Sequence, residues 1–229
     1  MIFEVVLMLA VVVLSYVAVV YRRNWLAAVF VNTTSTTAPS TDTKLEDLLE
    51  IADRYYAEHN YLAAEKAYLK VLKLDHKNSL AYSRLGFVYS NLGNINDAIE
   101  CFQIVADNYP NAASYHNLSM MYFKNREFEK SAAALEKSIG IEATASRLIA
   151  LARIYRVMNK YEAQIETLQK ALDLEPENIS IMQLLAEAYL HAKDDKQAKL
   201  MFRKILKLEP NNMRARAAIE PPRRLKKVR

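Results

Sequence analysis

Four histidines and one cysteine are the residues of this sequence best suited to metal binding or nucleophilic catalysis. Two histidines four residues apart on a helix can bind zinc, but no pair has that spacing among His59, His76, His116 and His191. Cys101 stands alone, which excludes a disulfide framework and predicts a small buried apolar side chain. Three glycines cannot form a phosphate-binding loop; they also leave few special turns and favour helices over a many-stranded sheet. We predict a protein that is not an enzyme and uses no metal and no cofactor.

An uncharged apolar run, VVLMLAVVVLSYVAVV, lies near the start of the sequence. With its flanks it makes residues 1–21 about long enough to cross a bilayer, which takes about 20 residues as a helix. Tyr21 and Trp25 follow, where aromatic side chains favour the lipid–water boundary. The run therefore predicts a transmembrane anchor.

The charges around this run separate the anchor from its alternatives and give it a direction. A cleaved signal peptide carries basic residues before its apolar core, whereas here Glu4 precedes the run and Arg22 and Arg23 follow it. A buried core helix is the other alternative, but it needs a large protein around it. Because basic residues stay on the cytoplasmic side, we expect a single-pass membrane protein with its N-terminus outside and its remainder cytoplasmic.

Residues 22–44 are expected to form a juxtamembrane linker. A short apolar stretch, WLAAVFV, is followed by the Thr/Ser-rich segment NTTSTTAPSTDT, which has no apolar face to bury. The linker would hold whatever follows close to the membrane surface.

The end of the sequence carries the whole net charge of +5, because residues 221–229 contain five basic residues and no acid. This basic tail could bind anionic lipid headgroups, contact nucleic acid non-specifically or remain solvated. Lipid contact ranks above nucleic acid because the predicted anchor places a membrane nearby. The residues for such a contact are Arg223, Arg224, Lys226, Lys227 and Arg229.

Five segments of 33–34 residues align between these ends, at 45–78, 79–111, 112–144, 145–178 and 179–212. Positions 4, 7, 8 and 11 of each segment form the apolar stripe of one helix, and positions 20, 24 and 27 form that of a second, antiparallel helix. Small residues at positions 8 and 20 let the two backbones approach closely. Position 11 is always tyrosine: Tyr55, Tyr89, Tyr122, Tyr155 and Tyr189.

This pattern resembles the tetratricopeptide repeat, and the resemblance covers residues 45–212. It implies an all-α superhelix, an α-solenoid of helix-turn-helix repeats, in addition to the predicted N-terminal transmembrane helix. Pro110, Pro176 and Pro210 fit the proline that follows the second helix, and residues 213–220 are expected to form a capping helix.

Two residues depart from the pattern. Gln164 occupies position 20, and we expect it either to open the fourth hairpin slightly or to extend its amide to the surface. Gly140 is expected to loosen the end of the second helix in the third repeat.

In the family that this chain resembles, the first helices of the repeats line a concave groove. That resemblance implies that partners bind there, with Phe87, Met120 and Phe123 as apolar anchors and charged side chains setting direction. The alternative is that these side chains belong to ordinary packing between repeats or to a solvated face. The complete set of groove residues is Arg84, Phe87, Asn91, His116, Asn117, Met120, Phe123, Arg153, Arg156 and Glu187. Some family members grip the C-terminal carboxylate of chaperones, but only Asn117 fits that pattern here, so this ligand is disfavoured.

The sequence thus predicts a non-enzymatic scaffold or adaptor, tethered to a membrane, that binds a partner peptide or helix in its groove. Two alternatives stay open. One is an assembly factor for envelope machinery, and the other is an organelle-surface receptor for targeting peptides. The partner's identity does not follow from the sequence.

Overall fold

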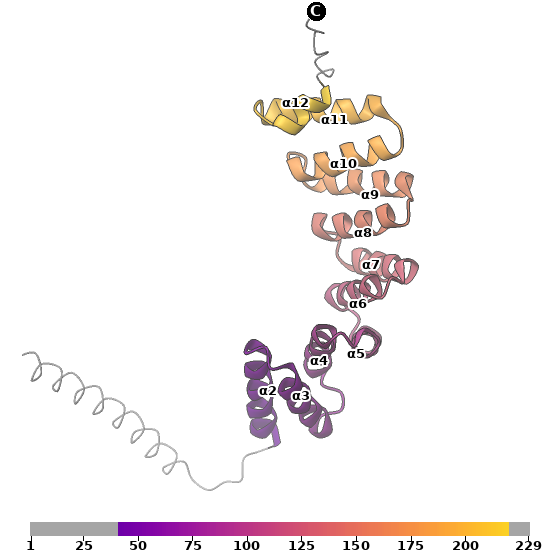
Figure 1. Ribbon diagram of the computed structural model, residues 1–229. Coiled ribbons are helices and arrows are strands. Elements are labelled where there is room, and N and C mark those ends of the chain that lie inside the picture. Colours follow the sequence, from indigo (N-terminus) through magenta and orange to yellow (C-terminus); the bar gives the residue numbers. More distant parts are fainter. Residues whose placement is uncertain (1–40, 220–229) are drawn as a thin grey trace, which may run out of the picture. The chain divides into compact units, whose positions relative to one another are not determined.

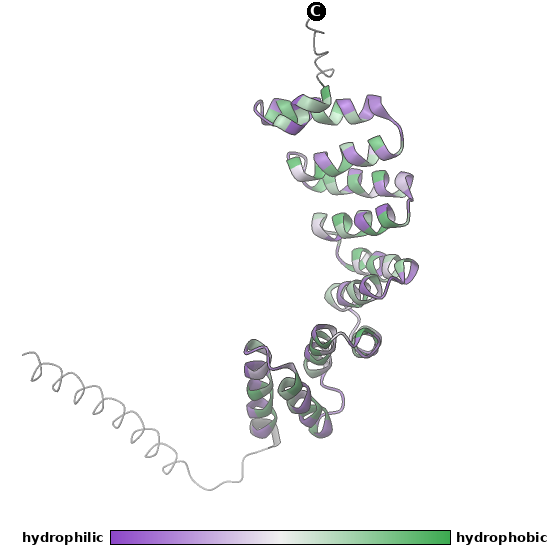
Figure 2. Ribbon diagram, in the orientation of Figure 1, coloured by the Kyte–Doolittle hydropathy of each residue, from purple (hydrophilic) through white to green (hydrophobic). Residues whose placement is uncertain are grey.

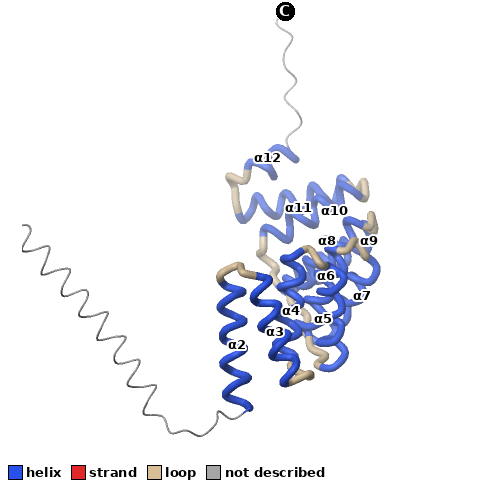
Figure 3. The backbone as a smooth tube through the Cα atoms, turned by 60° about the horizontal axis from the view of Figure 1, so that its bottom comes forward, coloured by secondary structure: helices blue, strands red, loops and turns tan. Residues whose placement is uncertain are grey.

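The structure is a computed structural model, and it describes residues 41–219. Within that range the chain forms eleven helices and no strand (Figure 1, Figure 3). The helices are α2 (Thr41–Ala57), α3 (Tyr61–Leu74), α4 (Ser79–Leu92), α5 (Ile95–Asn108), α6 (Ala112–Lys124), α7 (Phe128–Ile141), α8 (Ala145–Val157), α9 (Tyr161–Leu174), α10 (Ile179–His191), α11 (Asp195–Leu208) and α12 (Met213–Ile219). Each of these helices carries both hydrophobic and hydrophilic residues (Figure 2). The all-α solenoid of two-helix repeats is confirmed.

The two ends of the sequence are outside this description. The predicted anchor, residues 1–21, and the basic tail, residues 221–229, lie beyond the described residues. Within residues 41–219, no helix combines the length and the apolar character that crossing a membrane requires. The first helix begins at Thr41, so the last residues of the predicted linker, 22–44, are helical.

Each later repeat begins at a side chain that caps its first helix. The oxygen of Asn78 accepts a hydrogen bond from the backbone N–H of Ala81 at 2.9 Å, satisfying a donor that has no partner inside the helix. The same contact recurs every 33–34 residues, at Asn78, Asn111, Thr144, Asn178 and Asn212. Because these caps bond backbone N–H groups at the start of each helix, they define where each repeat begins, independently of the apolar stripes.

The turn inside each repeat uses a left-handed residue at position 15. Four of the five are not glycine: His59, Arg126, Asn159 and Lys193 have φ of 58°, 62°, 57° and 60°, and only Gly93 (φ 84°) is glycine. In every turn the N–H at position 16 donates to the carbonyl of the position-11 tyrosine at 2.8–2.9 Å, which closes the helix end. The scarcity of glycine therefore does not mean few special turns, and that expectation was wrong.

The position-11 tyrosines also join neighbouring repeats. The Tyr122 hydroxyl donates to Gln103 at 2.8 Å, that of Tyr155 donates to Glu136 at 2.5 Å, and that of Tyr189 accepts from Gln169 at 2.8 Å. We call this bond, from position 11 of one repeat to position 25 of the repeat before it, the tyrosine latch. Burial first, and then the bond to Glu136, raises the pKa of Tyr155 to about 12, so its hydroxyl keeps the proton that it donates.

The two helices of each hairpin meet at positions 8 and 20, and most of these contacts are between small residues. Ala52 meets Ala64 in the first repeat, both fully buried. In the third repeat the Ser119 and Ser131 hydroxyls each donate to the other's backbone carbonyl at 2.8 Å, which satisfies both buried groups. These contacts keep the two backbones of a hairpin close.

For each of the two departures from the pattern, the structure tests one part of what we expected. Gln164 is 2% exposed, and its Oε1 is buried without a hydrogen-bond partner, so the amide does not reach the surface. Close packing of α9 against α8 leaves this side chain no path outward. The helix α7 continues through Gly140 to Ile141 and has 14 residues, the same number as α5 and α9, so the helix end is not shortened.

The last helix covers the end of the array. α12 buries Ala215 against the fifth repeat, and Arg214 forms an ion pair with Glu187 of α10. It lies where a sixth repeat would place its first helix, as a capping helix does.

Candidate functional site

A pocket opens on the face formed by the first helices of the third and fourth repeats. Its volume is about 250 Å³, and we call it the groove pocket. α6 and α8 form its walls, and α7 forms its floor between them. Its lining consists of His116, Ser119, Met120, Phe123, Lys124, Ser131, Leu135, Ala150, Arg153 and Ile154.

Two large apolar side chains stand at this pocket without being covered. Met120 is 41% exposed and Phe123 is 39% exposed, whereas Leu135 and Ile154 beneath them are buried. The Phe123 ring is held by an edge-to-face contact with Phe128, with the ring centres 5.5 Å apart. An apolar group entering the pocket would therefore meet a fixed aromatic wall and an apolar floor.

The charged residues at the groove pocket all have one sign. Lys124 and Arg153 contribute cations, and the lining contains no aspartate or glutamate. Lys124 Nζ donates to Ser90 Oγ at 2.6 Å, which places the ammonium at the edge nearest the second repeat. The groove pocket therefore combines an apolar interior with a cationic rim.

His116 lines the same pocket with a neutral ring. Its Nδ1 is buried without a hydrogen-bond partner. Burial, and then the nearby charge of Arg147, lower the pKa of His116 from its ordinary value, so the ring is neutral at pH 7. His116 therefore adds no charge to the cationic rim.

The structure brings four of the ten predicted groove residues together at this pocket: His116, Met120, Phe123 and Arg153. Asn117 and Arg156 share the same helices but do not line it. Glu187 is further along the array and is held by the ion pair with Arg214 of the capping helix.

The remaining three predicted residues make contacts within the second repeat and with the first. Phe87 packs edge-to-face on the buried ring of Phe102, with the ring centres 4.9 Å apart. Arg84 Nε lies 3.5 Å from Asp53 Oδ1, an ion pair across the first two repeats. The Asn91 amide donates to the Phe87 carbonyl at 2.8 Å. Phe87 thus contributes to packing between helices, and the exposed apolar surface is centred on Met120 and Phe123.

Sequence reasoning missed the floor of the groove pocket. Leu135 occupies position 24 of the apolar stripe, and Ile154 occupies position 10, which the pattern does not include. The signal for Leu135 was the repeat register itself, since any gap between two first helices must expose the second helix beneath. Ile154 belongs to the wall helix α8 and had no such signal.

Other chemistry has no support in the part of the chain that the structure describes. Residues 41–219 contain no group of three or more histidine, cysteine, aspartate or glutamate side chains placed to hold a metal ion. Cys101 is buried, and burial first, and then Glu100, raises the pKa of its thiol to about 12. A thiol with that pKa is a poor nucleophile at pH 7.

Comparison with known proteins gives three matches to models described as "Tetratricopeptide repeat", at residues 67–100, 112–144 and 158–220. Two curated yeast proteins are similar, both from Saccharomyces cerevisiae (strain ATCC 204508 / S288c). The anaphase-promoting complex subunit CDC16 is 29% identical over 145 residues, and the RNA polymerase-associated protein CTR9 is 30% identical over 129 residues. The matches cover 59% and 52% of this chain but only 17% and 12% of those proteins, so the chain spans less than a fifth of their length.

Solved structures show the same fold over most of this chain. A crystal structure of MamA protein is 27% identical, with a TM-score of 0.65 over 72% of this chain and 92% of that one. YrrB, described as a TPR protein with an unusual peptide-binding site, is 15% identical, with a TM-score of 0.63 over 80% of this chain and 98% of that one, a likeness of fold alone. The three repeat matches together cover more than half of the sequence, and the helices follow the same register. The chain belongs to the tetratricopeptide repeat family.

Proposed function

We propose that this protein is a membrane-tethered, non-enzymatic scaffold that holds one segment of a partner protein in the groove pocket. The tetratricopeptide repeat fold is that of a protein–protein interaction scaffold. The observation that carries the finer proposal is the exposure of Met120 and Phe123 over an apolar floor. Exposed apolar side chains around a pocket are typical anchors of a protein interface.

The charges of the groove pocket define what the partner segment contains. Its lining offers Lys124 and Arg153 and no acid, so a carboxylate beside the pocket would gain attraction without repulsion. The partner segment therefore places a large apolar side chain in the pocket and an aspartate, a glutamate or a terminal carboxylate next to it. This differs from the chaperone-tail grip, which depends on residues that this groove lacks.

Selection from a random peptide library displayed on phage tests this proposal without knowledge of the partner. Peptides enriched on the full chain are expected to pair a large apolar residue with an adjacent acid. The variant Met120→Ala/Phe123→Ala should weaken binding of an enriched peptide about 10- to 100-fold, because truncating an anchor residue costs about 2 kcal/mol and each tenfold change corresponds to about 1.4 kcal/mol. Lys124→Glu/Arg153→Glu should shift the selected neighbour from acidic to basic.

The matched control is Leu200→Ala, which removes a side chain of α11 that is 43% exposed and distant in sequence from the groove pocket. It should leave peptide affinity unchanged. Enrichment of peptides with no apolar–acidic pairing, or equal weakening by Leu200→Ala and the pocket variant, would contradict a specific groove site.

The tether is proposed from the sequence of residues 1–21 and the arginines that follow them. The full chain is expected to stay with membranes during alkaline carbonate extraction, and a variant without residues 1–21 should be released. A reporter at the C-terminus should be active on the cytoplasmic side. Release of both forms, or a reporter active only outside, is the result that excludes this orientation and anchor.

A further inference from the structure

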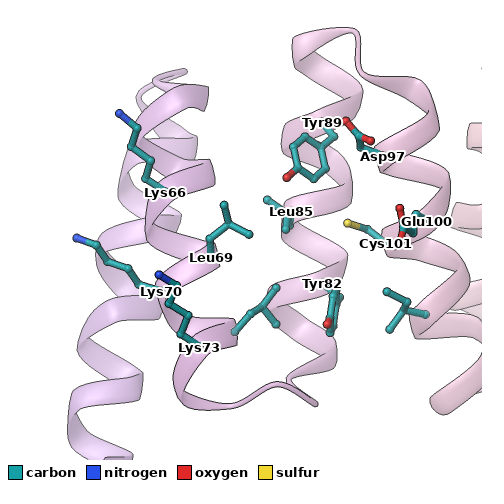
Figure 4. A pocket seen from close by; sticks show the side chains of 12 residues that line it. Lys66, Leu69, Lys70, Lys73, Tyr82, Leu85, Tyr89, Asp97, Glu100 and Cys101 are labelled. Atoms are coloured by element: carbon teal, nitrogen blue, oxygen red, sulfur yellow. The ribbon is translucent and has the colours of Figure 1, made fainter.

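A second, larger cleft lies on the opposite face of the array, between the second helices of the first two repeats. Its volume is about 710 Å³. α3 and α5 form its walls, and Tyr82, Leu85 and Tyr89 of α4 lie between them (Figure 4). We call it the first-seam cleft. It shares no residue with the groove pocket.

The first-seam cleft lies at the one junction between two repeats, or seam, that lacks the tyrosine latch in residues 41–219. Tyr89 faces Glu65 of α3 instead, and burial first, and then the carboxylate of Glu65, raise the pKa of Tyr89 to about 12. The three later seams have Gln103, Glu136 or Gln169 at position 25, and each bonds the tyrosine of the next repeat. At the first seam position 25 is Leu69, which cannot bond the Tyr89 hydroxyl. Leu69 is 39% exposed and points into the cleft instead (Figure 4).

Clefts between second helices recur in this array, and the first differs from two others in size and lining. Those between α7 and α9 and between α9 and α11 measure about 380 and 400 Å³, little more than half the volume of the first. At position 25 the wall of the first cleft carries Leu69, whereas the walls of the two smaller clefts carry Glu136 and Gln169. Ordinary packing between repeats accounts for the two smaller clefts, but not for the size and apolar wall of the first.

Opposite charges line the two walls of the first-seam cleft. Lys66, Lys70 and Lys73 follow one another along a single face of α3, at spacings of four and three residues. Asp97 and Glu100 lie on α5 across from them (Figure 4). No ion pair joins the two walls within residues 41–219, so these charges are available to a ligand.

We propose that the first-seam cleft binds an amphipathic helix of another protein. Its apolar stripe would lie against Leu69, Leu85 and Ile104, as in helix-in-groove recognition. The flank facing α3 would carry acids spaced by three and four residues, and the flank facing α5 would carry lysine or arginine. A second copy of this chain fits less well, because two such clefts placed face to face would enclose an unfilled space.

Three synthetic peptides of about 20 residues provide the probe, a length at which a helix can form. All share one leucine stripe. The first has glutamates on one flank and lysines on the other, the second has lysines on both, and the third has glutamates on both. Fluorescence polarisation with the full chain should show the mixed peptide binding about 10-fold tighter than either of the others, with the difference shrinking at high salt. Equal affinities for the three peptides, or no saturable binding, would overturn the proposal.

Two variants locate the binding. Lys66→Glu/Lys70→Glu/Lys73→Glu makes both walls acidic and should transfer the preference to the all-lysine peptide. Leu69→Gln replaces the apolar wall with the amide that the latched seams carry at position 25, so it should weaken the mixed peptide about 10-fold or more. Its circular dichroism melt should show that the fold is retained.

Matched controls separate this site from general charge and from the groove pocket. Lys196→Glu/Lys199→Glu/Lys207→Glu changes the net charge equally on α11, and Met120→Ala/Phe123→Ala disables the groove pocket. Both should bind the mixed peptide as the unchanged chain does. If the α11 variant lost affinity for the mixed peptide as strongly as the α3 variant does, the attraction would be non-specific and the first-seam cleft would be excluded as the site. The groove variant separates this site from the groove pocket, so failure of the proposed function would not affect the result.

Discussion

Replacing Gln164 with leucine is expected to raise the free energy of unfolding by about 1–3 kcal/mol. The Gln164 side chain is 2% exposed, and its Oε1 has no hydrogen-bond partner, so folding removes this oxygen from water without compensation. Leucine has a similar volume and no polar atom, so it keeps the contacts between α8 and α9 and removes that cost. Denaturation of the full chain with urea, followed by circular dichroism, measures the difference.

Gln169→Leu is the matched control for this substitution, one turn further along α9. It makes the same chemical change where the amide donates to the Tyr189 hydroxyl at 2.8 Å. Loss of that tyrosine latch should lower stability by about 0.5–1.5 kcal/mol. If both leucine variants shifted the midpoint in the same direction, the opposite roles given to these two glutamines would be wrong.

Gly86→Ala is expected to lower stability by about 1–3 kcal/mol, even though alanine is the better helix former. An added Cβ would lie 2.7 Å from Cε2 of Phe102, closer than carbon atoms pack. The Phe102 ring is fully buried and is held by Phe87 on another side, so it cannot move aside freely. The midpoint of thermal unfolding should fall by about 2–4 °C for each kcal/mol of lost stability in a chain of this size.

Gly140→Ala provides the comparison, because an added Cβ there meets no atom within 4 Å. Gly140 lies in α7 without a left-handed φ, so alanine should stabilise the chain by up to about 1 kcal/mol. Equal effects of the two substitutions would show that helix propensity decides at both sites and that the contact between Gly86 and Phe102 does not matter.

The repeat architecture could be predicted from the sequence because it depends on residues that recur. Position 11 is tyrosine in all five repeats, and positions 8 and 20 are small in most of them, so period and helix pairing followed directly. The structure starts its first helices at Ser79, Ala112, Ala145 and Ile179, where the predicted repeats begin.

Features that depend on a single side chain could not be predicted in the same way. Whether Gln164 turns outward or inward depends on the space left by its neighbours, not on its place in the repeat. The tyrosine latch depends on position 25, which lies outside the recurring pattern. The left-handed turns at His59, Arg126 and Lys193 could not be predicted from glycine, because these positions carry other residues. Hydrogen bonds at the helix end hold them in that conformation.

The candidate site could be predicted only in part for a related reason. Met120 and Phe123 were identified because they are large residues at groove positions. Phe87 satisfies the same rule, but its ring packs on Phe102, a contact that depends on Gly86 leaving room for it. Which large residue is free to bind is decided by its neighbours in space.

The missing tyrosine latch gives this array a mechanical property. In a linear stack, tension passes from one repeat to the next only through the seams, so the weakest seam yields first. A load between the proposed membrane tether and a partner held at α6 and α8 would pass through the seam of Leu69 and Tyr89. There the ion pair between Arg84 and Asp53 and the hydrogen bond from the Asn91 amide to the Tyr56 hydroxyl join the two repeats through their first helices. The first seam would thus carry tension along the groove face, whereas the later seams would also carry it through their tyrosine latches.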